Sequence, residues 1–252
     1  MPVIKTAIIT GGSRGLGKDM ALSIARKGLD VILTYRSKEE EAKEVVAMIN
    51  QLGQKAAALQ LDLTDLTTLD IFKTKVKGLL AGWNVASFDY LINNAGMGAT
   101  VPFEQVTESV FDEFLNVHFK GVYFLTQKLV PHMSHGGGII NISSGTTRFA
   151  NPGYSVYASM KGAVEVLTKY FAKELGAKGI RCNIVAPGPV ETDFNNAAIR
   201  NNPEMKNRLS AITPLGRVGV ASDIGGVVAF LCTDDAGWIN GQRIEVSGGI
   251  NV

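Results

Sequence analysis

The sequence predicts an α/β fold in which a doubly wound, mostly parallel sheet carries helices on both faces. Short runs rich in Ile, Val and Leu alternate with longer segments whose apolar residues recur at helical spacing. This alternation is the pattern of βαβ units, which build parallel sheets. With 46% hydrophobic residues and no Pro- or Ser-rich linker, the chain can bury one large core. We therefore expect a single domain spanning residues 1–252.

Seven predicted strands follow one another along the chain. They cover residues 7–10, 31–35, 56–63, 90–93, 138–143, 180–186 and 244–246. Short apolar runs of this kind are typical of strands buried on both faces. The predicted helices between them include residues 16–27, 39–52, 66–80, 110–129 and 157–175. Together these elements predict a seven-stranded Rossmann fold.

Composition argues against several classes of protein. The 25 basic and 23 acidic residues leave a formal charge of +2, so neither nucleic acid nor a membrane surface is an expected partner. Cys182 and Cys232 lie in apolar stretches, where a reduced thiol fills the core. His132 and His135 are expected to be solvated, and no metal-ligand cluster is visible. The chain opens into the strand-like run VIKTAIIT without a leader pattern, so we expect a cytoplasmic protein.

A serine, a tyrosine and a lysine predict a general acid and base. Tyr157 and Lys161 are four residues apart at the head of a predicted helix, so both side chains point the same way. A cation beside a phenol lowers the phenol pKa from its usual value of about 10. Ser144 follows the fifth strand, at the sheet edge where α/β folds bind ligands. An ordinary polar pair on a surface helix would also give this short pattern.

A glycine-rich turn directly after the first strand predicts a dinucleotide site. The sequence TGGSRGLG places Gly11, Gly15 and Gly17 at the entry to a helix. Glycines permit a tight turn and let N–H groups approach a pyrophosphate, which the helix N-terminus also attracts. A simple strand-to-helix connection is the alternative, but the position favours the dinucleotide.

The end of the second strand indicates which dinucleotide binds. An NAD site has Asp or Glu there to bind the ribose 2′-hydroxyl, whereas this chain has Tyr35, Arg36 and Ser37. Arg36 and Arg14 can instead bind a 2′-phosphate, because a guanidinium matches its oxygens. We expect NADP(H) as the cofactor. Two solvated arginines are the alternative, and use of both cofactors stays open.

Six motifs in order make the chain resemble the short-chain dehydrogenase/reductase family in its single-domain form. They are TGGSRGLG, LDLTD, NNAG, Ser144, YASMK and PGPVET. The separation from Ser144 to Tyr157, 157 − 144 = 13 residues, also suits that family. The match extends to the closing GQRIEVSGG, so it covers nearly the whole chain.

The resemblance implies roles for individual residues. Asp62 and Leu63 would edge the adenine, Lys161 would hold the nicotinamide ribose, and Thr192 would seat the carboxamide. Together with the phosphate-binding candidates, the expected cofactor contacts are Gly11, Ser13, Arg14, Gly15, Leu16, Gly17, Arg36, Ser37, Asp62, Leu63, Asn93, Ala95, Gly96, Tyr157, Lys161, Pro187, Gly188, Val190 and Thr192.

One position departs from the family pattern. Such enzymes usually carry an asparagine three residues before a glycine in the fourth helix, where a local distortion holds a water that links the lysine to solvent. Counted back from Gly121, this register holds His118, and the nearby asparagine is Asn116. An apolar stripe through Phe111, Leu115 and His118 points the histidine inward. Its near-neutral pKa suits a proton relay, and a core histidine without a catalytic role is an equal alternative.

Substrate contacts are expected from three variable segments, residues 98–103, 146–154 and 191–212. The last of these is polar and rich in Asn, and we predict that it forms a lid. Phe149 and Phe194 suggest an apolar wall, although each can equally serve packing.

These features predict an NADPH-dependent reductase that converts a ketone reversibly to a secondary alcohol. Tyr157 donates a proton while hydride reaches the carbonyl carbon, Ser144 binds the oxygen, Lys161 lowers the phenol pKa and His118 reconnects the site to water. Two alternatives stay open. The stretch TYRSKEEEA resembles 3-oxoacyl-thioester reductases of fatty-acid synthesis, and the fold can also serve a non-catalytic NADP(H)-binding sensor. By resemblance, we expect a homotetramer joined through the fourth and fifth predicted helices.

Overall fold

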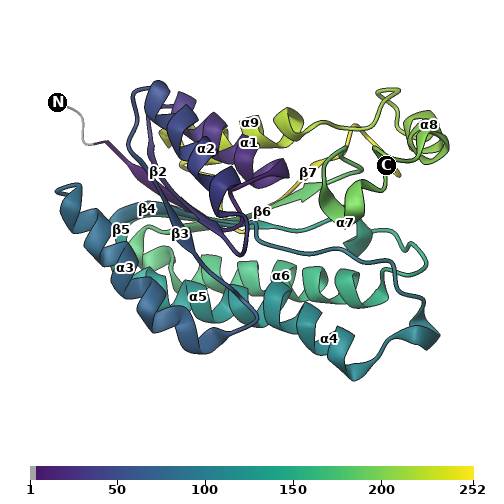
Figure 1. Cartoon of the computed structure of the whole chain (residues 1–252), viewed down its shortest axis with the longest axis horizontal. Coiled ribbons are helices and arrows are strands. Elements are labelled where there is room, and N and C mark those ends of the chain that lie inside the picture. The colour runs from purple at the N-terminus through teal and green to yellow at the C-terminus, as the bar shows by residue number, and fades with distance from the viewer. Residues whose placement is uncertain (1–3) are drawn as a thin grey trace.

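The computed structural model describes residues 4–252 and shows one sheet of parallel strands in the order β3-β2-β1-β4-β5-β6-β7 (Figure 1). The strands are β1 (Thr6–Ile9), β2 (Asp30–Tyr35), β3 (Ala56–Gln60), β4 (Phe88–Asn93), β5 (Met133–Ile142), β6 (Arg181–Pro187) and β7 (Arg243–Val246). The chain winds outward from β1 to β3 and then places β4 on the other side of β1. In α/β sheets, a reversal of this kind marks the edge, at the carboxyl ends of the strands, where ligands bind in a crevice. The predicted doubly wound fold is confirmed, with parallel pairing throughout.

Helices cover both faces of the sheet, as the alternation of segments predicts. The upper layer of Figure 1 contains α1 (Gly15–Arg26), α2 (Glu39–Gln51) and α9 (Ala221–Leu231). The lower layer contains α3 (Leu69–Gly82), α4 (Glu108–Leu115), α5 (Gly121–Leu129) and α6 (Ser155–Glu174). Successive strand residues serve opposite cores, since Ile9 packs with α1 and α9 whereas Ile8 packs with α3, α5 and α6. Both faces of the sheet are therefore buried.

Some predicted limits are wrong. Strand β3 ends at Gln60 instead of Leu63, because the Asp62 carboxylate accepts a hydrogen bond from the Thr64 N–H (2.9 Å) and turns the chain. Strand β5 begins at Met133, before the predicted start at Gly138.

Helix α9 is absent from the predicted elements. Its sequence contains Gly225 and Gly226, which lower helix propensity. A Cβ at position 225 would overlap the Asp19 carboxylate of α1. Glycine thus allows the two helices to pack closely, and this tertiary contact outweighs the poor local propensity.

The 191–212 segment contains α7 (Phe194–Ala197) and α8 (Pro203–Ala211). Elsewhere, Cys182 and Cys232 are buried, free thiols, as expected, and burial raises the pKa of Cys182 to about 12. Within residues 4–252, no helix has both the length and the apolar character needed to cross a membrane. The predicted run VIKTAIIT begins at Val3, which lies outside the described residues.

Candidate active site

The structure brings the predicted site residues together at the carboxyl edge of the sheet. They lie at residues 11–17 after β1, 36–37 after β2, 62–63 after β3, 93–96 at the end of β4, 144 after β5 and 187–192 at the end of β6. Tyr157 and Lys161 lie in the first two turns of α6. Segments that are far apart in the sequence therefore border one crevice.

The glycine turn has the backbone geometry of a phosphate-binding loop. Gly11 and Gly15 have φ angles of +67° and +54°, which residues with a Cβ rarely adopt. A Cβ at Gly17 would overlap the Gly11 carbonyl oxygen. Helix α1 begins with no side-chain cap and no acidic residue in its first turn, so its N–H groups are available to an anion. These residues fit a dinucleotide pyrophosphate.

The end of β2 presents cations and no carboxylate. Tyr35 is followed by the exposed Arg36 and Ser37, and Arg14 is exposed at the start of α1. The Arg36 Nε lies 4.0 Å from Asp62 Oδ2, a loose surface contact that leaves the guanidinium free for another anion. Exposed arginines at this edge fit the 2′-phosphate of NADP(H).

The two asparagines of the NNAG motif have different roles. The Asn93 side chain turns into the core, where its Nδ2 donates to Asn141 Oδ1 (2.8 Å) and to Thr126 Oγ1 (3.1 Å). Asn94 instead donates to the carbonyl oxygens of Thr10 (2.9 Å) and Gly11 (3.1 Å). The latter contacts tie the loop after β4 to the glycine turn. Asn94 was missed because adjacent identical residues give no sign of which one faces the turn.

Ser144, Tyr157 and Lys161 converge beside the end of β5. The Lys161 Nζ donates to the Ile142 carbonyl oxygen (2.7 Å), which holds α6 against the strand. The same Nζ lies 5.7 Å from the centroid of the Tyr157 ring. The Ser144 Oγ accepts from the Thr146 N–H (3.2 Å), so the start of the following turn orients the serine.

Burial acts on both ionisable groups of this trio. It raises the pKa of the Tyr157 hydroxyl well above 10, with the nearby Ser144 hydroxyl opposing the shift. It lowers the pKa of Lys161 to about 8. The expected lowering of the tyrosine pKa by Lys161 is therefore wrong for this structure, because loss of water disfavours the phenolate and the ammonium alike.

A π-helical turn, η3 (Asn116–Lys120), joins α4 to α5 within the predicted helix 110–129. The Gly121 N–H bonds to the Asn116 carbonyl oxygen, five residues back. The turn changes which residues face inward: Phe114 is 2% exposed, whereas Phe111, assigned to the inward stripe, is 42% exposed. His118 is 1% exposed, so its predicted inward position is confirmed. Single π turns of this kind are frequent at functional sites.

His118 lies directly beside Tyr157. Its ring stacks on Phe114 with centroids 5.5 Å apart, and it meets the Tyr157 ring edge-on at 5.2 Å. The Nε2 lies 2.9 Å from the Met97 carbonyl oxygen, while Nδ1 is buried without a hydrogen-bond partner. Burial, aided by the charge of Lys161, holds the pKa of His118 well below 6.5. The expected near-neutral pKa is therefore wrong, and the ring is neutral.

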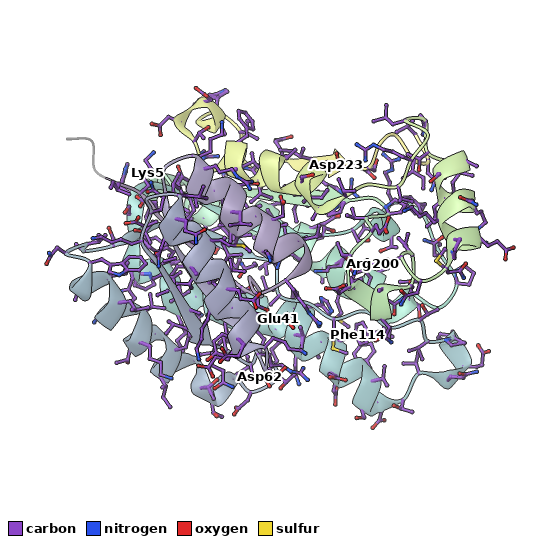
Figure 2. The ribbon with its side chains drawn as sticks, turned by 45° about the horizontal axis from the view of Figure 1, so that its top comes forward. Lys5, Glu41, Asp62, Phe114, Arg200 and Asp223 are labelled. Carbon is purple, nitrogen blue, oxygen red and sulfur yellow. The ribbon has the colours of Figure 1, made fainter. Side chains whose placement is uncertain are left out.

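The 191–212 segment approaches this trio through Phe194. The Phe194 ring centroid lies 5.9 Å from that of Tyr157, as the predicted apolar wall requires. Phe149 instead packs against Gly145, where an added Cβ would lie 2.9 Å from its ring. Arg200 of the same segment pairs with Asp193 (2.7 Å). Figure 2 labels Arg200 and Phe114 on the side of the molecule that carries α7 and α8.

Largely buried charges support the loop that carries Ser144. Arg243 of β7 donates to the Ser144 carbonyl oxygen (3.3 Å) and to the Glu165 carboxylate of α6 (2.8 Å). Glu165 also accepts from the hydroxyls of Ser143 (2.6 Å) and Thr147 (2.7 Å). No sequence motif marks this network, because only the sheet order brings β7 beside the serine loop.

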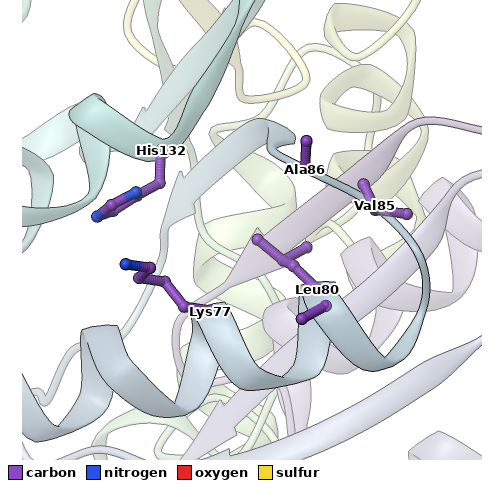
Figure 3. Close-up of a pocket in the computed structure, with 6 residues that line it drawn as sticks. Lys77, Leu80, Val85, Ala86 and His132 are labelled. Carbon is purple, nitrogen blue, oxygen red and sulfur yellow. The ribbon is translucent and has the colours of Figure 1, made fainter.

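A shallow depression of about 210 Å³ lies apart from this site, beside α3 (Figure 3). It is lined by Lys77, Leu80, Ala81, Val85, Ala86 and His132. His132 is half-buried there instead of solvated, and its pKa is lowered by burial and by the nearby Lys77. His135 is exposed, as predicted. Among the described residues, no group of His, Cys, Asp and Glu is arranged to hold a metal ion.

Comparison with known proteins adds sequence and structural relatives. A family model described as Enoyl-(Acyl carrier protein) reductase matches residues 11–251. The 3-oxoacyl-[acyl-carrier-protein] reductase FabG of Staphylococcus aureus is 36% identical over 252 residues, covering 99% of each chain.

Two solved ketoreductases share the fold closely. The promiscuous reductase LugOII, which catalyses keto-reduction at C1 during lugdunomycin biosynthesis, has a TM-score of 0.93 and 36% identity over 98% of both chains. The angucycline C-6 ketoreductase LanV, with bound NADP, has a TM-score of 0.92 and 36% identity over 98% of this chain and 95% of its own.

Proposed function

The chain belongs to the short-chain dehydrogenase/reductase family, and from this premise we propose that it uses NADPH to reduce a ketone to a secondary alcohol. The observation that carries the proposal is the convergence of Ser144, Tyr157 and Lys161 beside a glycine turn suited to a dinucleotide. A module that only binds NADP(H) needs no proton donor at the crevice. The structural relatives LugOII and LanV are ketoreductases, and LanV was solved with NADP.

Each residue of the trio has a distinct part in the reaction. NADPH, when bound in the crevice, supplies the hydride. Tyr157 donates its phenolic proton to the carbonyl oxygen, and a pKa well above 10 keeps that proton in place at neutral pH. The Ser144 hydroxyl donates a hydrogen bond to the same oxygen and stabilises its developing charge. Lys161, with a pKa of about 8, can return a proton towards the phenol after turnover.

His118 completes the proton path in this proposal, as a neutral hydrogen-bonding group. With the proton on Nε2, which faces the Met97 carbonyl oxygen, the buried Nδ1 is an acceptor without a hydrogen-bond partner. Nδ1 accepts a hydrogen bond from water or from the lysine during proton return. A ring that stays neutral in this way takes the place of the asparagine usual in the family.

The proposed cofactor is NADP(H) in preference to NAD(H). Arg36 and Arg14 would bind the 2′-phosphate, the glycine turn the pyrophosphate, and Lys161 the nicotinamide ribose. The exposure of both guanidiniums and the lack of an acid after Tyr35 support this preference.

The proposed substrate is a ketone with an apolar ring next to its carbonyl. The Tyr154 ring lies 6.3 Å from that of Tyr157, centroid to centroid, so this side of the crevice has an aromatic wall. LugOII and LanV are ketoreductases, which supports a ketone as the substrate. The second candidate substrate is a 3-oxoacyl thioester, which the 36% identity to FabG favours.

The test is NADPH consumption by the purified chain with α-tetralone, ethyl acetoacetate and acetoacetyl coenzyme A. We expect reduction of α-tetralone. Tyr157→Phe should bind NADPH, as measured by fluorescence titration, and lose at least about 10²-fold in turnover. Robust turnover by that variant would refute the assignment. Reduction of the thioester alone would favour the second candidate, and no consumption with any compound would favour the NADP(H)-binding sensor.

We also propose that four chains assemble. The outer surfaces of α5 and α6 expose apolar side chains, including Tyr123, Phe124, Val166 and Tyr170, of which Tyr170 is 62% exposed. Strand β7 at the sheet edge is the second proposed contact. Sedimentation should give about four times the 26.9 kDa chain mass. Tyr170→Glu should lower that mass, and a monomer in the unmodified protein would contradict the proposal.

A further inference from the structure

Three loops meet beside the Tyr157 ring, and one hydrogen-bonded cluster joins them. The loop after β4 contributes Thr100, the loop before α6 contributes Tyr154, and the 191–212 segment contributes Asn195. Asn195 Nδ2 donates to the hydroxyls of Tyr154 (3.1 Å) and Thr100 (3.3 Å), and the Thr100 hydroxyl donates to that of Tyr154 (3.2 Å). We call these three side chains the clamp. It fastens the 191–212 segment to both other loops.

Next to the clamp, the Phe194 ring packs directly against the backbone of Gly98. A Cβ at Gly98 would lie 2.5 Å from Phe194 Cε1 and 2.6 Å from its Cζ, so the ring fills the space of a side chain at position 98. The Phe194 N–H donates to Thr192 Oγ1 (3.2 Å), which anchors the start of the segment. The same ring lies 5.9 Å from the Tyr157 ring, centroid to centroid, so it is close both to Gly98 and to the proposed proton donor.

The backbone after Phe194 is strained. Asn195, Asn196 and Ala197 have φ angles of +52°, +56° and +55°, in the left-handed region that L-residues occupy at a cost. Asn tolerates this region better than Ala does. Such strain persists only where surrounding contacts hold it. The clamp is one of the contacts that hold this strained backbone in place.

We infer that Phe194 is a specificity-determining residue that closes the crevice to wide ketones when it rests on Gly98. With the clamp formed, the ring leaves room beside Tyr157 for narrow ketones alone. When Asn195 releases its two partners, the ring leaves Gly98 and a wide, ring-bearing ketone reaches the phenol. This inference rests on the proposed function, and it adds the residues that decide the size of the substrate.

The test compares kcat/KM for a narrow ketone, ethyl acetoacetate, and a wide one, α-tetralone. In Phe194→Ala, the ratio of kcat/KM for α-tetralone to kcat/KM for ethyl acetoacetate should rise about tenfold, because only the wide ketone needs the open state. Gly98→Ala should act in the same direction, since its methyl group displaces the ring. In the double variant, Gly98→Ala should add nothing to Phe194→Ala, because it acts through that ring.

Phe111→Ala is the matched control, because Phe111 on α4 is exposed to nearly the same extent (42%) as Phe194 (44%) and lies outside the three segments expected to contact substrate; it should leave the ratio of the two kcat/KM values unchanged. Equal NADPH affinity across the variants, by fluorescence titration, shows that they are folded. An active wild-type enzyme whose ratio does not change in Phe194→Ala would overturn the inference alone. A wild-type protein that reduces neither ketone would overturn the proposed function, and this inference with it.

Discussion

Replacing Lys161 with methionine should change how the stability of the protein depends on pH. Lys161 is 5% exposed, and burial lowers its pKa from 10.5 to about 8. In the unfolded chain the amine holds its proton up to a pH of about 10.5. Between these two values the unfolded state binds one more proton than the folded state, so the free energy of unfolding rises with pH.

The magnitude follows from the pKa difference, 10.5 − 8 = 2.5 units. At about 1.36 kcal/mol per unit, the buried ammonium costs about 3 kcal/mol below pH 8, and this cost disappears as the pH approaches 10.5. Lys161→Met lacks the charge, but it also removes the donor to the Ile142 carbonyl oxygen, which costs about 1–3 kcal/mol at every pH. The pH dependence, and not the absolute stability, therefore isolates the ammonium.

The assay is urea unfolding of both proteins without NADPH, at about pH 7 and about pH 9.5. Over this interval the wild type should gain about 2 kcal/mol relative to Lys161→Met, since the other titrating groups are shared and cancel. Lys43→Met, which removes an exposed lysine on α2, should show no such change. Parallel pH curves for wild type and Lys161→Met would refute the reasoning, because they would mean that the ammonium is not desolvated.

Four further substitutions test other parts of the site. Gly17→Ala should abolish NADPH binding because its Cβ would overlap a carbonyl oxygen of the turn; Gly78→Ala, in open space on α3, should bind normally by the same fluorescence titration. Arg36→Asp should weaken NADPH binding about tenfold more than NADH binding, and equal losses would contradict a 2′-phosphate contact. His118→Ala should lower turnover and alter its pH profile, whereas an unchanged profile would limit the histidine to packing. Arg243→Met should lower kcat about tenfold at constant NADPH affinity, because the serine loop loses its support; an unchanged kcat would show that the loop is held without it.

Most of the sheet is predictable because the residues of its central strands are buried and mainly apolar. Strand ends are less predictable, since a side chain such as Asp62 stops β3 through one local hydrogen bond. Helix α9 is hard to predict because Gly225 has poor helix propensity. The close approach of α9 to Asp19, which requires that glycine, cannot be seen in the sequence. Sequence patterns thus indicate the local preference for helix or strand, whereas contacts between distant segments determine where such elements end and whether a weakly preferred helix forms.

The same distinction between local patterns and tertiary packing applies to the site. The spacing of Tyr157 and Lys161 predicts that they share a helix face, but it does not predict how deeply the two side chains are buried. The spacing therefore predicts the nearby charge but not the desolvation, and desolvation is what raises the pKa of Tyr157 instead of lowering it. The support of Ser144 by Arg243 depends on the order of the strands, so it has no signature within any one segment.

The π turn at Asn116–Lys120 accommodates one residue more than an uninterrupted α-helix would. Deleting a single residue there would give a more regular helix from Glu108 to Leu129. It would also rotate α4 by about 100° relative to α5, because each helical residue advances by that angle. Phe114 would then swing off the His118 ring and leave one side of it bare. We therefore expect the variant with the regular helix to be less active than the wild type. Deletion of one residue from the π turn should lower activity even when the protein still folds.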